Sequence, residues 1–334
     1  MELPRAIRQA VDATLEGLPL CDLQQAARRL SERYRTETRD GRVHLSDRMA
    51  AMAYLAARLP ATYAAVRATF ASIGEVRPDF MPQNLLDAGA GPGTGLFAAH
   101  DCWPEMVDAT LIESASTIRD VGKDLLRAAN IQHVRWMSND LAAFPTLQTR
   151  HDLVLASYVL DELAPAAIGP LIDHLWEATG DMLVVIEPGT PSGWARILAV
   201  REHLLAAGAH MVAPCPHALE CPLSPPDWCH FSRRVARSRM HRMTKSADVP
   251  WEDEKFIYVA ISRHRGPHPQ ARVIAPPQVR GGTVSLKLCE DSGDAAMRLL
   301  SRRQGEAYRQ ARRLQWGDIV WPGAIIPADS TVSS

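Results

Sequence analysis

From residue 84 onward, short apolar runs alternate with segments that are long enough to form helices. Five of these runs predict buried strands: NLLDAG, VDATLIE, HVRWM, DLVLAS and MLVVIE. Strands that are apolar throughout and alternate with helices are typical of a parallel sheet covered by helices on both faces. We therefore expect an α/β fold built on a doubly wound sheet.

The segments on either side of this region predict three further parts. Residues 1–80 carry apolar side chains at helical spacing and would form an N-terminal helical domain. Residues 81–266 would form the α/β domain, with a cysteine-bearing loop inserted at residues 212–231. Residues 267–320 would form a small basic extension that contains β-strands, and residues 321–334 would form a loose tail.

Single residues predict several element boundaries. Ser46 is expected to cap the start of a helix, Pro60 to interrupt that helix and Gly74 to end it. The run EKFIYVAISR is expected to return to the sheet as an antiparallel edge strand. Gly281 and Gly282 are expected to form a turn between two short strands.

Composition places the chain among soluble globular proteins. Its 334 residues are 46% apolar and 22% charged, and such a chain can bury more than one core. Neither a secretory signal nor an apolar run of membrane-spanning length is recognisable. These features predict a cytoplasmic location, no membrane partner and reduced cysteines, and we also expect a monomer. Reduced thiols favour a metal site over disulfides.

The net charge of −1 conceals an asymmetry. Residues 230–315 hold 18 Lys and Arg against eight Asp and Glu, whereas the rest of the chain holds 19 against 30. A basic region of this kind forms either a solvated surface or a docking face for a polyanion such as RNA. A helix over residues 233–242 would bring Arg234, Arg237 and Arg242 towards one side, where they could meet phosphates.

A glycine-rich loop, LLDAGAGPGTG, follows the first predicted strand. Glycine lets the backbone pass close to a ligand and lets a helix begin directly after the strand. A dinucleotide fingerprint would need Gly or Ala where this chain has Thr94. The loop instead resembles the first motif of class I S-adenosylmethionine-dependent methyltransferases, an acid followed by Gly-x-Gly-x-Gly. The matching residues are Asp87, Gly89, Gly91 and Gly93.

Two further acids stand where methyltransferases of this class contact their cofactor. Glu113 ends the second strand, where a carboxylate can accept both ribose hydroxyls. Asp140 follows the third strand, where this class contacts the adenine. The resemblance therefore implies a class I methyltransferase (Rossmann-like) fold that binds S-adenosylmethionine at the carboxyl ends of these strands.

The segment after the fourth strand, ASYVLDEL, faces the methyl acceptor in this class. Tyr158, Asp161 and Glu162 would either line an acceptor pocket or cap the next helix and face water, and the second interpretation is favoured. The segment lacks the Asn/Asp-Pro-Pro-aromatic motif of many base methyltransferases. Because methyl transfer depends chiefly on alignment of the reactants, no catalytic residue can be assigned.

Residues 212–231, VAPCPHALECPLSPPDWCHF, gather three cysteines, two histidines and five prolines. Proline excludes a regular helix or a central strand here. Cys215, Cys221 and Cys229 lack the closely spaced pairs that are typical of structural zinc sites. Iron–sulfur clusters are held by thiolates at more varied spacing. The loop therefore favours a cluster, with zinc as the alternative.

A fourth ligand must come from elsewhere. The remaining thiols are those of Cys21, Cys102 and Cys289, and a zinc site could also use His217 or His230. Two other interpretations carry less weight. The thiols of the loop could be inert, or the first of them could be a nucleophile like that of cytosine-C5 methyltransferases.

The loop and its surroundings carry a closer resemblance. The stretches EPGTPSGW, GAHMVAPCPH, DWCHFSRRVARSRMHR, EDEKFIYVAISR, LPATYAAVRATF and RLQWGD resemble the bacterial and mitochondrial methyltransferase-like family of the small ribosomal subunit. Mitochondrial members of that family are assembly factors. The resemblance covers roughly residues 3–320 and implies small-subunit ribosomal RNA as a partner. It also implies a four-iron–four-sulfur cluster, whose ligands would be Cys215, Cys221, Cys229 and Cys289.

Three functions compete at this point. The chain could be an S-adenosylmethionine-dependent methyltransferase of ribosomal RNA, which the complete glycine loop favours. It could be a non-catalytic assembly factor that keeps the methyltransferase fold, which the missing base-methylation motif favours. A small-molecule methyltransferase would leave the basic C-terminal part unexplained. In each case Cys21 and Cys102 are expected to take no part in the cluster, and His217 and His230 to lie around it.

Overall fold

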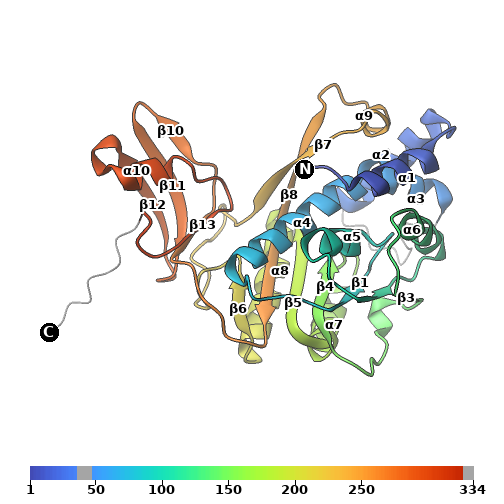
Figure 1. The fold of residues 1–334 in the computed structure, drawn as a ribbon, viewed down its shortest axis with the longest axis horizontal. Coiled ribbons are helices and arrows are strands. Elements are labelled where there is room, and N and C mark those ends of the chain that lie inside the picture. Colours follow the sequence, from blue (N-terminus) through green and yellow to red (C-terminus); the bar gives the residue numbers. More distant parts are fainter. Residues whose placement is uncertain (36–46, 326–334) are drawn as a thin grey trace.

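The computed structural model describes residues 1–35 and 47–325. Its elements form a group of N-terminal helices, a central sheet with helices on both faces and a second, smaller sheet near the C-terminus (Figure 1). Within the described ranges, no helix has both the length and the apolar character needed to cross a membrane.

Four helices precede the central sheet: α1 (Arg5–Leu15), α2 (Leu20–Arg35), α3 (Arg48–Ala57) and α4 (Leu59–Val76). Asp47 caps α3, because its side chain accepts a hydrogen bond from the Ala50 N–H at 2.8 Å. The predicted cap, Ser46, lies outside the described residues. Pro60 separates α3 from α4 as predicted, whereas the predicted stop at Gly74 is wrong, since α4 continues past it.

The central sheet consists of β1 (Asn84–Ala88), β2 (Asp108–Ile112), β3 (Val134–Met137), β4 (His151–Ser157), β5 (Thr179–Pro188), β6 (His210–Ala213), β7 (Phe231–Ala236) and β8 (Trp251–Ser262). Its order is β3-β2-β1-β4-β5-β8-β6, and β7 pairs with β8. The first five strands run parallel, and β8 is antiparallel to its neighbours. This order, with its one reversed strand between β5 and β6, is that of class I methyltransferases, so the predicted fold class is confirmed.

The strand order reverses between β1 and β4, and this reversal distributes the helices. Right-handed crossovers in opposite directions from this point place their helices on opposite faces of the sheet. The helices are α5 (Thr94–Cys102), α6 (Ser116–Ala128), α7 (Pro165–Glu177) and α8 (Pro191–Ala206). The crevice at the switch point, beyond the carboxyl ends of β1 and β4, is therefore where this topology binds ligands.

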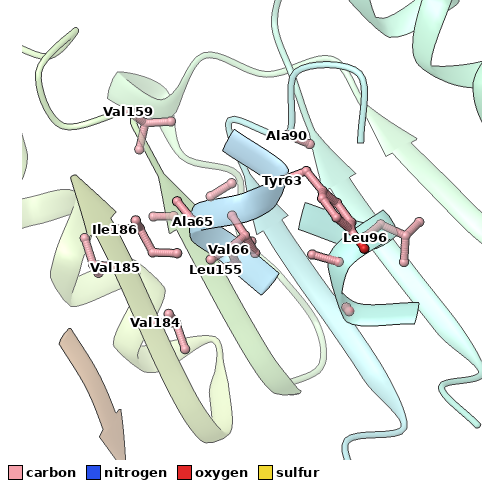
Figure 2. Close-up of a cluster of buried hydrophobic side chains, with 14 of the residues drawn as sticks. Tyr63, Ala65, Val66, Ala90, Leu96, Leu155, Val159, Val184, Val185 and Ile186 are labelled. Carbon is pink, nitrogen blue, oxygen red and sulfur yellow. The ribbon is translucent and has the colours of Figure 1, made fainter. Parts of the chain in front are cut away.

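Helix α4 packs directly on the central sheet. Figure 2 shows Tyr63, Ala65 and Val66 of this helix over Leu155 of β4 and Ile186 of β5, all of them buried. One hydrophobic core therefore runs from the N-terminal helices through the sheet. Fully burying side chains of this size stabilises the fold by about 1.5–3 kcal/mol each. The division at residue 80 remains a prediction.

The antiparallel strand β8 is not the edge strand that the sequence predicted. The short run HMVA forms β6 and pairs with its outer side, from His210 opposite Ser262 to Ala213 opposite Ala260. Only four residues long, β6 is too short to stand out by periodicity in a segment crowded with turn residues. It matters for the site because the cysteine loop begins immediately after it.

The C-terminal extension has a sheet and a core of its own. Its elements are β9 (Ala271–Val273), β10 (Gln278–Arg280), β11 (Thr283–Glu290), β12 (Ala295–Ser301), α10 (Glu306–Ala311) and β13 (Ile319–Val320). Gly281 and Gly282 have φ values of 52° and 89° and form the turn between β10 and β11, as predicted. A separate set of buried side chains, including Val273 and Leu286, fills this core.

Candidate cofactor and metal sites

The glycine-rich loop joins β1 to α5 at the switch point of the sheet. Gly89, Gly91 and Gly93 have φ values of 76°, 54° and 90°, a region that other residues rarely adopt. A side chain at Gly89 would also place its Cβ 2.3 Å from Cγ1 of Val159. The loop therefore requires glycine both for its backbone conformation and for its close packing.

Asp87, at the end of β1, is an acid without a good partner. Only 1% of the residue is exposed, and neither carboxylate oxygen accepts a hydrogen bond of good geometry from the described residues. Burial and the nearby charge of Glu113 raise its pKa to about 7, although the Gly95 N–H partly offsets this. A buried carboxylate that lacks a hydrogen-bond partner fits a ligand that brings a hydrogen-bond donor or a positive charge.

This burial predicts how stability depends on pH. Asp87 has a higher pKa in the folded chain than in the unfolded chain, so folding takes up a proton. The free energy of unfolding should therefore fall as the pH rises from the ordinary Asp range through about 7. In the absence of cofactor, the free energy of unfolding of Asp87→Asn should exceed that of the wild type by about 1–3 kcal/mol at about pH 8. The difference should be small at about pH 4. Thermal melts across this range measure the effect, and parallel curves for the two proteins would refute it.

Glu113 follows β2 and is held against the glycine loop. Its Oε2 accepts the Gly91 N–H at 3.0 Å and its Oε1 accepts the Ala115 N–H at 2.8 Å. Burial raises the pKa of this carboxyl, and the two backbone N–H groups act in the opposite direction. The structure thus brings Glu113 together with Asp87 and the glycines, as the resemblance to class I methyltransferases implied.

Asp140 lies farther from these groups. It is exposed and caps a short 3-10 helix (Leu141–Ala143) by accepting the Ala142 N–H at 2.9 Å. Its neighbour Leu141 nevertheless reaches the loop, with Cδ1 3.3 Å from where a Cβ on Gly89 would lie. The segment after β3 therefore borders the loop, and contact of Asp140 itself with a cofactor stays a prediction.

Tyr54 of α3 was missed by the sequence analysis. Its hydroxyl lies 3.9 Å from the position of a Cβ on Gly91 and 3.5 Å from the hydroxyl of Thr62. Burial raises the pKa of this tyrosine. An aromatic residue in an alanine-rich helix was the available signal, but helical periodicity alone gives no information about which loop the helix covers.

The segment after β4 has an unusual backbone at Tyr158, whose φ is 58°. The hydroxyl of this residue donates to Glu254 Oε1 at 3.0 Å, and Arg58 lies 3.3 Å from the same oxygen. Glu162 is exposed and Asp161 is buried, and the N-cap residue of α7 is Ala164. The favoured interpretation is therefore right for the exposure of Glu162 and wrong for that of Asp161.

Glu187, at the end of β5, adds a second buried acid near this segment. It is fully buried, accepts Arg196 Nε at 2.6 Å and accepts the Leu160 N–H at 3.2 Å. Burial and the nearby charge of Asp161 raise its pKa to about 8. The region next to the loop is therefore acidic and dry, whereas the sequence indicated only that acids were present there.

All four predicted metal-binding cysteines line one pocket. Cys215, Cys221 and Cys229 come from the loop between β6 and β7, and Cys289 comes from β11 of the C-terminal sheet. The pocket contains about 490 Å³ of empty space, part of it open to solvent, and its other walls are mostly apolar. Cys21 is exposed on α2, and neither it nor Cys102 of α5 lines this pocket.

The fold fastens the cysteine loop from two sides. Trp228 Nε1 donates to the Gly189 carbonyl at 3.1 Å, and Lys287 of β11 forms an ion pair with Asp227. These contacts connect the loop to β5 on one side and to the C-terminal sheet on the other. The loop therefore lies between the two cores of the molecule, and a group bound to its thiols would join them.

The arrangement of the thiols bears on which metal group they could bind. No group of three or more His, Cys, Asp or Glu side chains among the described residues meets at a position for a single metal ion. A zinc ion needs its ligands within about 2.3 Å of one point, whereas each thiolate of an iron–sulfur cluster binds a different iron. Burial raises the pKa of Cys289 to about 12 and raises the pKa of Cys229 well above its ordinary value. Bound metal would therefore have to displace protons from these thiols.

The two histidines of the loop differ. His217 is buried, with Nε2 3.4 Å from Cys289 Sγ, and burial lowers its pKa. His230 does not line the pocket; its ring stacks on Trp228 and meets the edge of Trp316. His217 thus lies beside a predicted ligand, and the expected position of His230 next to a cluster has no support in these contacts.

The basic segment after the loop is not the helix that the sequence predicted. Residues 231–236 form strand β7, and only residues 239–245 form a helix, α9. Arg234 pairs with Asp253 at 3.1 Å and Arg237 with Glu252 at 3.0 Å, because β8 places acids opposite the basic strand. The count of charges along the sequence could not show that acids of β8 neutralise these two arginines. Arg239 and Arg242 on α9 remain exposed.

This chain is similar in sequence to known proteins of the mitochondrial ribosome. A sequence model of the family described as mitochondrial small ribosomal subunit Rsm22 matches residues 48–322. The human ribosome assembly protein METTL17, mitochondrial, is 29% identical over 304 residues, which cover 83% of this chain and 64% of that protein. The Rsm22-cox11 tandem protein 2, mitochondrial, of Schizosaccharomyces pombe is 25% identical over 328 residues, covering 80% of this chain and 42% of that protein. The chain spans less than two thirds of the length of either relative.

Solved structures were compared as well. Magnesium protoporphyrin IX methyltransferase from Synechocystis, with bound S-adenosylmethionine, matches with a TM-score of 0.40 and 13% identity over 70% of this chain and 90% of that one. The N-methyltransferase NodS from Bradyrhizobium japonicum matches with a TM-score of 0.38 and 16% identity over 60% of this chain and 94% of that one.

The family comparison corrects one prediction. The cytoplasmic location is contradicted, because the family and both relatives are described as mitochondrial. The prediction rested on the lack of a recognisable secretory signal, which does not distinguish the cytoplasm from other compartments. The family model itself covers most of the sequence, including the central sheet and the C-terminal extension. The chain therefore belongs to the mitochondrial small ribosomal subunit Rsm22 family.

Proposed function

We propose that this chain is a methyltransferase-fold protein that binds S-adenosylmethionine and acts in the assembly of the small ribosomal subunit and in translation. Small-subunit ribosomal RNA is the proposed partner. The observation that carries this proposal is the family match over residues 48–322. The relative named as a ribosome assembly protein aligns with 83% of this chain.

Binding of S-adenosylmethionine is supported by the glycine loop and its two acids. The loop has the left-handed backbone that lets a ligand approach closely. Asp87 is a buried acid without a good partner, and Glu113 is oriented by Gly91 and Ala115. When bound, the cofactor would supply an activated methyl group. Asp87, Gly89, Gly91, Gly93, Glu113 and Asp140 are the proposed binding residues.

A four-iron–four-sulfur cluster is the proposed occupant of the cysteine pocket. The donor set fits, because four thiols from two separate parts of the fold line one cavity. Cys215, Cys221 and Cys229 lack the closely spaced pairs of structural zinc sites, which favours a cluster over zinc. When bound by Cys215, Cys221, Cys229 and Cys289, the cluster would cross-link the loop to the C-terminal sheet and stabilise both.

Methyl transfer to ribosomal RNA is a second candidate activity, favoured by the complete glycine loop. The side chains of this chain would then act chiefly by orientation and by excluding water. Tyr158 does not offer a free hydroxyl as a base, since its proton is held by Glu254. Binding in assembly is therefore the primary proposal, and no residue is assigned to catalysis.

A strain that lacks this protein tests the proposal. Sucrose gradients should show a deficit of small subunits and of assembled ribosomes, and the wild-type gene should restore both. Mass spectrometry of small-subunit RNA from the same strain separates the two activities. A missing methyl group that returns with the wild type indicates catalysis, and an unchanged set of modifications indicates assembly alone. A normal subunit profile in the mutant would refute the proposed role.

The basic region 233–313 is proposed to dock on this RNA, and its salt dependence is predictable. Affinity for a small-subunit RNA fragment should fall steeply between about 50 and 200 mM salt. Replacing both Arg239 and Arg242 by Gln should lower the slope of log affinity against log salt by about 1.4–1.8. Both arginines are exposed on α9. The control variant is Arg127→Gln, which removes an arginine that lies on α6 and pairs with Asp124. An unchanged slope in the double variant would show that α9 does not meet phosphates.

A further inference from the structure

Two arginines are buried in the wall of the cysteine pocket. Arg272 of β9 is 1% exposed and Arg201 of α8 is 3% exposed. Arg272 lies opposite Cys289 in the register of β9 and β11, and Arg201 reaches the pocket from the other side of the loop. No feature of the sequence distinguished them from the many surface arginines.

Within residues 1–35 and 47–325, both guanidinium groups donate only to neutral oxygens. Arg272 binds the carbonyls of Pro214 and Gly317 and the hydroxyl of Ser72 at 2.5–2.9 Å. Arg201 binds the carbonyls of His217 and Leu219 at 3.1 and 2.5 Å.

Each arginine also keeps an unused donor. Nη2 of Arg272 and Nε of Arg201 have no hydrogen-bond partner among the described residues. The charge of Arg272 influences the pKa of Glu75, yet these two groups do not form an ion pair. Each arginine is therefore a buried cation with an unsatisfied N–H beside the pocket.

Two other arginines that are buried or half-buried have carboxylate partners. The buried Arg77 pairs with Asp79 at 2.9 Å, and the half-buried Arg196 pairs with Glu187 at 2.6 Å. An uncompensated buried charge costs several kcal/mol, and arginine cannot escape this cost by losing its proton. Two such charges beside four thiols therefore favour a negative group in the same cavity.

We propose that Arg201 and Arg272 are the counter-charges of an anionic, thiolate-bound iron–sulfur cluster in this pocket. Four thiolates carry more negative charge than the cluster core carries positive charge, so the bound group is an anion. The arginines are positioning residues: they would not bind iron, and their charge would act on the cysteine thiolates that do. This inference rests on the proposed cluster site. It adds that the two arginines stabilise the cluster and influence its reduction potential.

The charge of the arginines has a measurable consequence. A bound cluster would gain one negative charge on taking one electron from the radical anion that forms when the S–S bond of dithionite breaks, and this radical anion would be oxidised to sulfite. Nearby positive charge stabilises the reduced form more than the oxidised form. Removing that charge should therefore make the cluster harder to reduce and shift its potential to lower values.

The test uses the full chain, purified anaerobically, with four substitutions at the two positions. Arg201→Gln and Arg272→Gln remove the charge, and Arg201→Lys and Arg272→Lys keep it. Potentials are measured by titration monitored with electron paramagnetic resonance, alongside iron and acid-labile sulfide. Each Gln variant should lower the reduction equilibrium constant about tenfold, which is about 59 mV for one electron. The Lys variants should stay within about threefold of the wild type.

Controls separate charge from folding. Arg77 is buried and ion-paired but does not line the pocket, so Arg77→Gln should lower the melting temperature without moving the potential. Arg272 also joins three segments of chain, so Arg272→Gln can fail to fold, in which case Arg201→Gln and Arg272→Lys carry the test. Unchanged potentials in charge-free variants that keep their iron would overturn the inference.

The iron, zinc and sulfide content of the wild-type protein separates a failure of the cluster proposal from a failure of this inference. A preparation with zinc and no sulfide would refute the cluster alone. The arginines would then face an anionic zinc–thiolate site, and Arg201→Gln should weaken zinc about tenfold in a competition with a chelator. Unchanged zinc affinity would overturn the inference. A wild type that binds neither iron nor zinc would refute both proposals.

Discussion

Replacing Cys229 by Ser should remove most of the iron from the anaerobically purified protein and destabilise its C-terminal extension. The hydroxyl of serine is a poor ligand for iron, so the cluster would lose one of its four connections to the chain. Cys229 is central among these thiols, because its pKa is raised by burial and by the proximity of Cys215, Cys289 and Cys221. The free energy of unfolding should fall by about 2–4 kcal/mol, as when a cross-link that closes a long loop is lost.

Matched controls come from the remaining cysteines. Cys102→Ser removes a partly buried thiol on α5 that does not line the pocket, and Cys21→Ser removes an exposed one. Both variants should keep their brown colour, iron and sulfide, whereas Cys215→Ser, Cys221→Ser and Cys289→Ser should behave like Cys229→Ser. Iron retained in the Cys289 variant would exclude that residue as a ligand and separate the C-terminal sheet from the site.

Asp87→Ala and Gly91→Arg should each weaken the binding of S-adenosylmethionine at least a hundredfold, about 2.7 kcal/mol. The first variant removes the buried acid that lacks a protein partner. The second places a large side chain on a loop position whose φ of 54° suits glycine and whose backbone N–H orients Glu113. Isothermal titration calorimetry of the folded proteins measures the loss.

Gly208→Ala provides the control for backbone strain. Gly208 has a φ of 82° and no atom within 4 Å of where its Cβ would lie, and it is located after α8, away from the loop. This variant should lose stability by about 1 kcal/mol and bind cofactor like the wild type. A wild-type chain that binds no S-adenosylmethionine would show that the fold has been kept without its cofactor.

The sequence by itself predicted the features that depend on neighbouring residues. Five strands followed from apolar runs, and the start of α5 followed from glycines with left-handed φ values. The division between α3 and α4 followed from Pro60, because proline acts on its own turn of helix. Asp87 and Glu113 could be placed together since parallel strands end at one edge of a sheet. For the strands, the start of α5 and the division at Pro60, the physical cause lies within a few residues of the pattern.

Only the tertiary structure decided which distant groups meet. Arg234 and Arg237 lost their expected role as a basic helix face because β8 supplies acids that pair with them, Asp253 opposite Arg234 and Glu252 within reach of Arg237. Tyr54 reaches the glycine loop only because its helix packs over that end of the sheet. Arg272 becomes a buried charge beside Cys289 through the register of β9 and β11. Strand pairing and packing bring together residues far apart in the chain, and no local pattern of residues records those contacts or the burial that they produce.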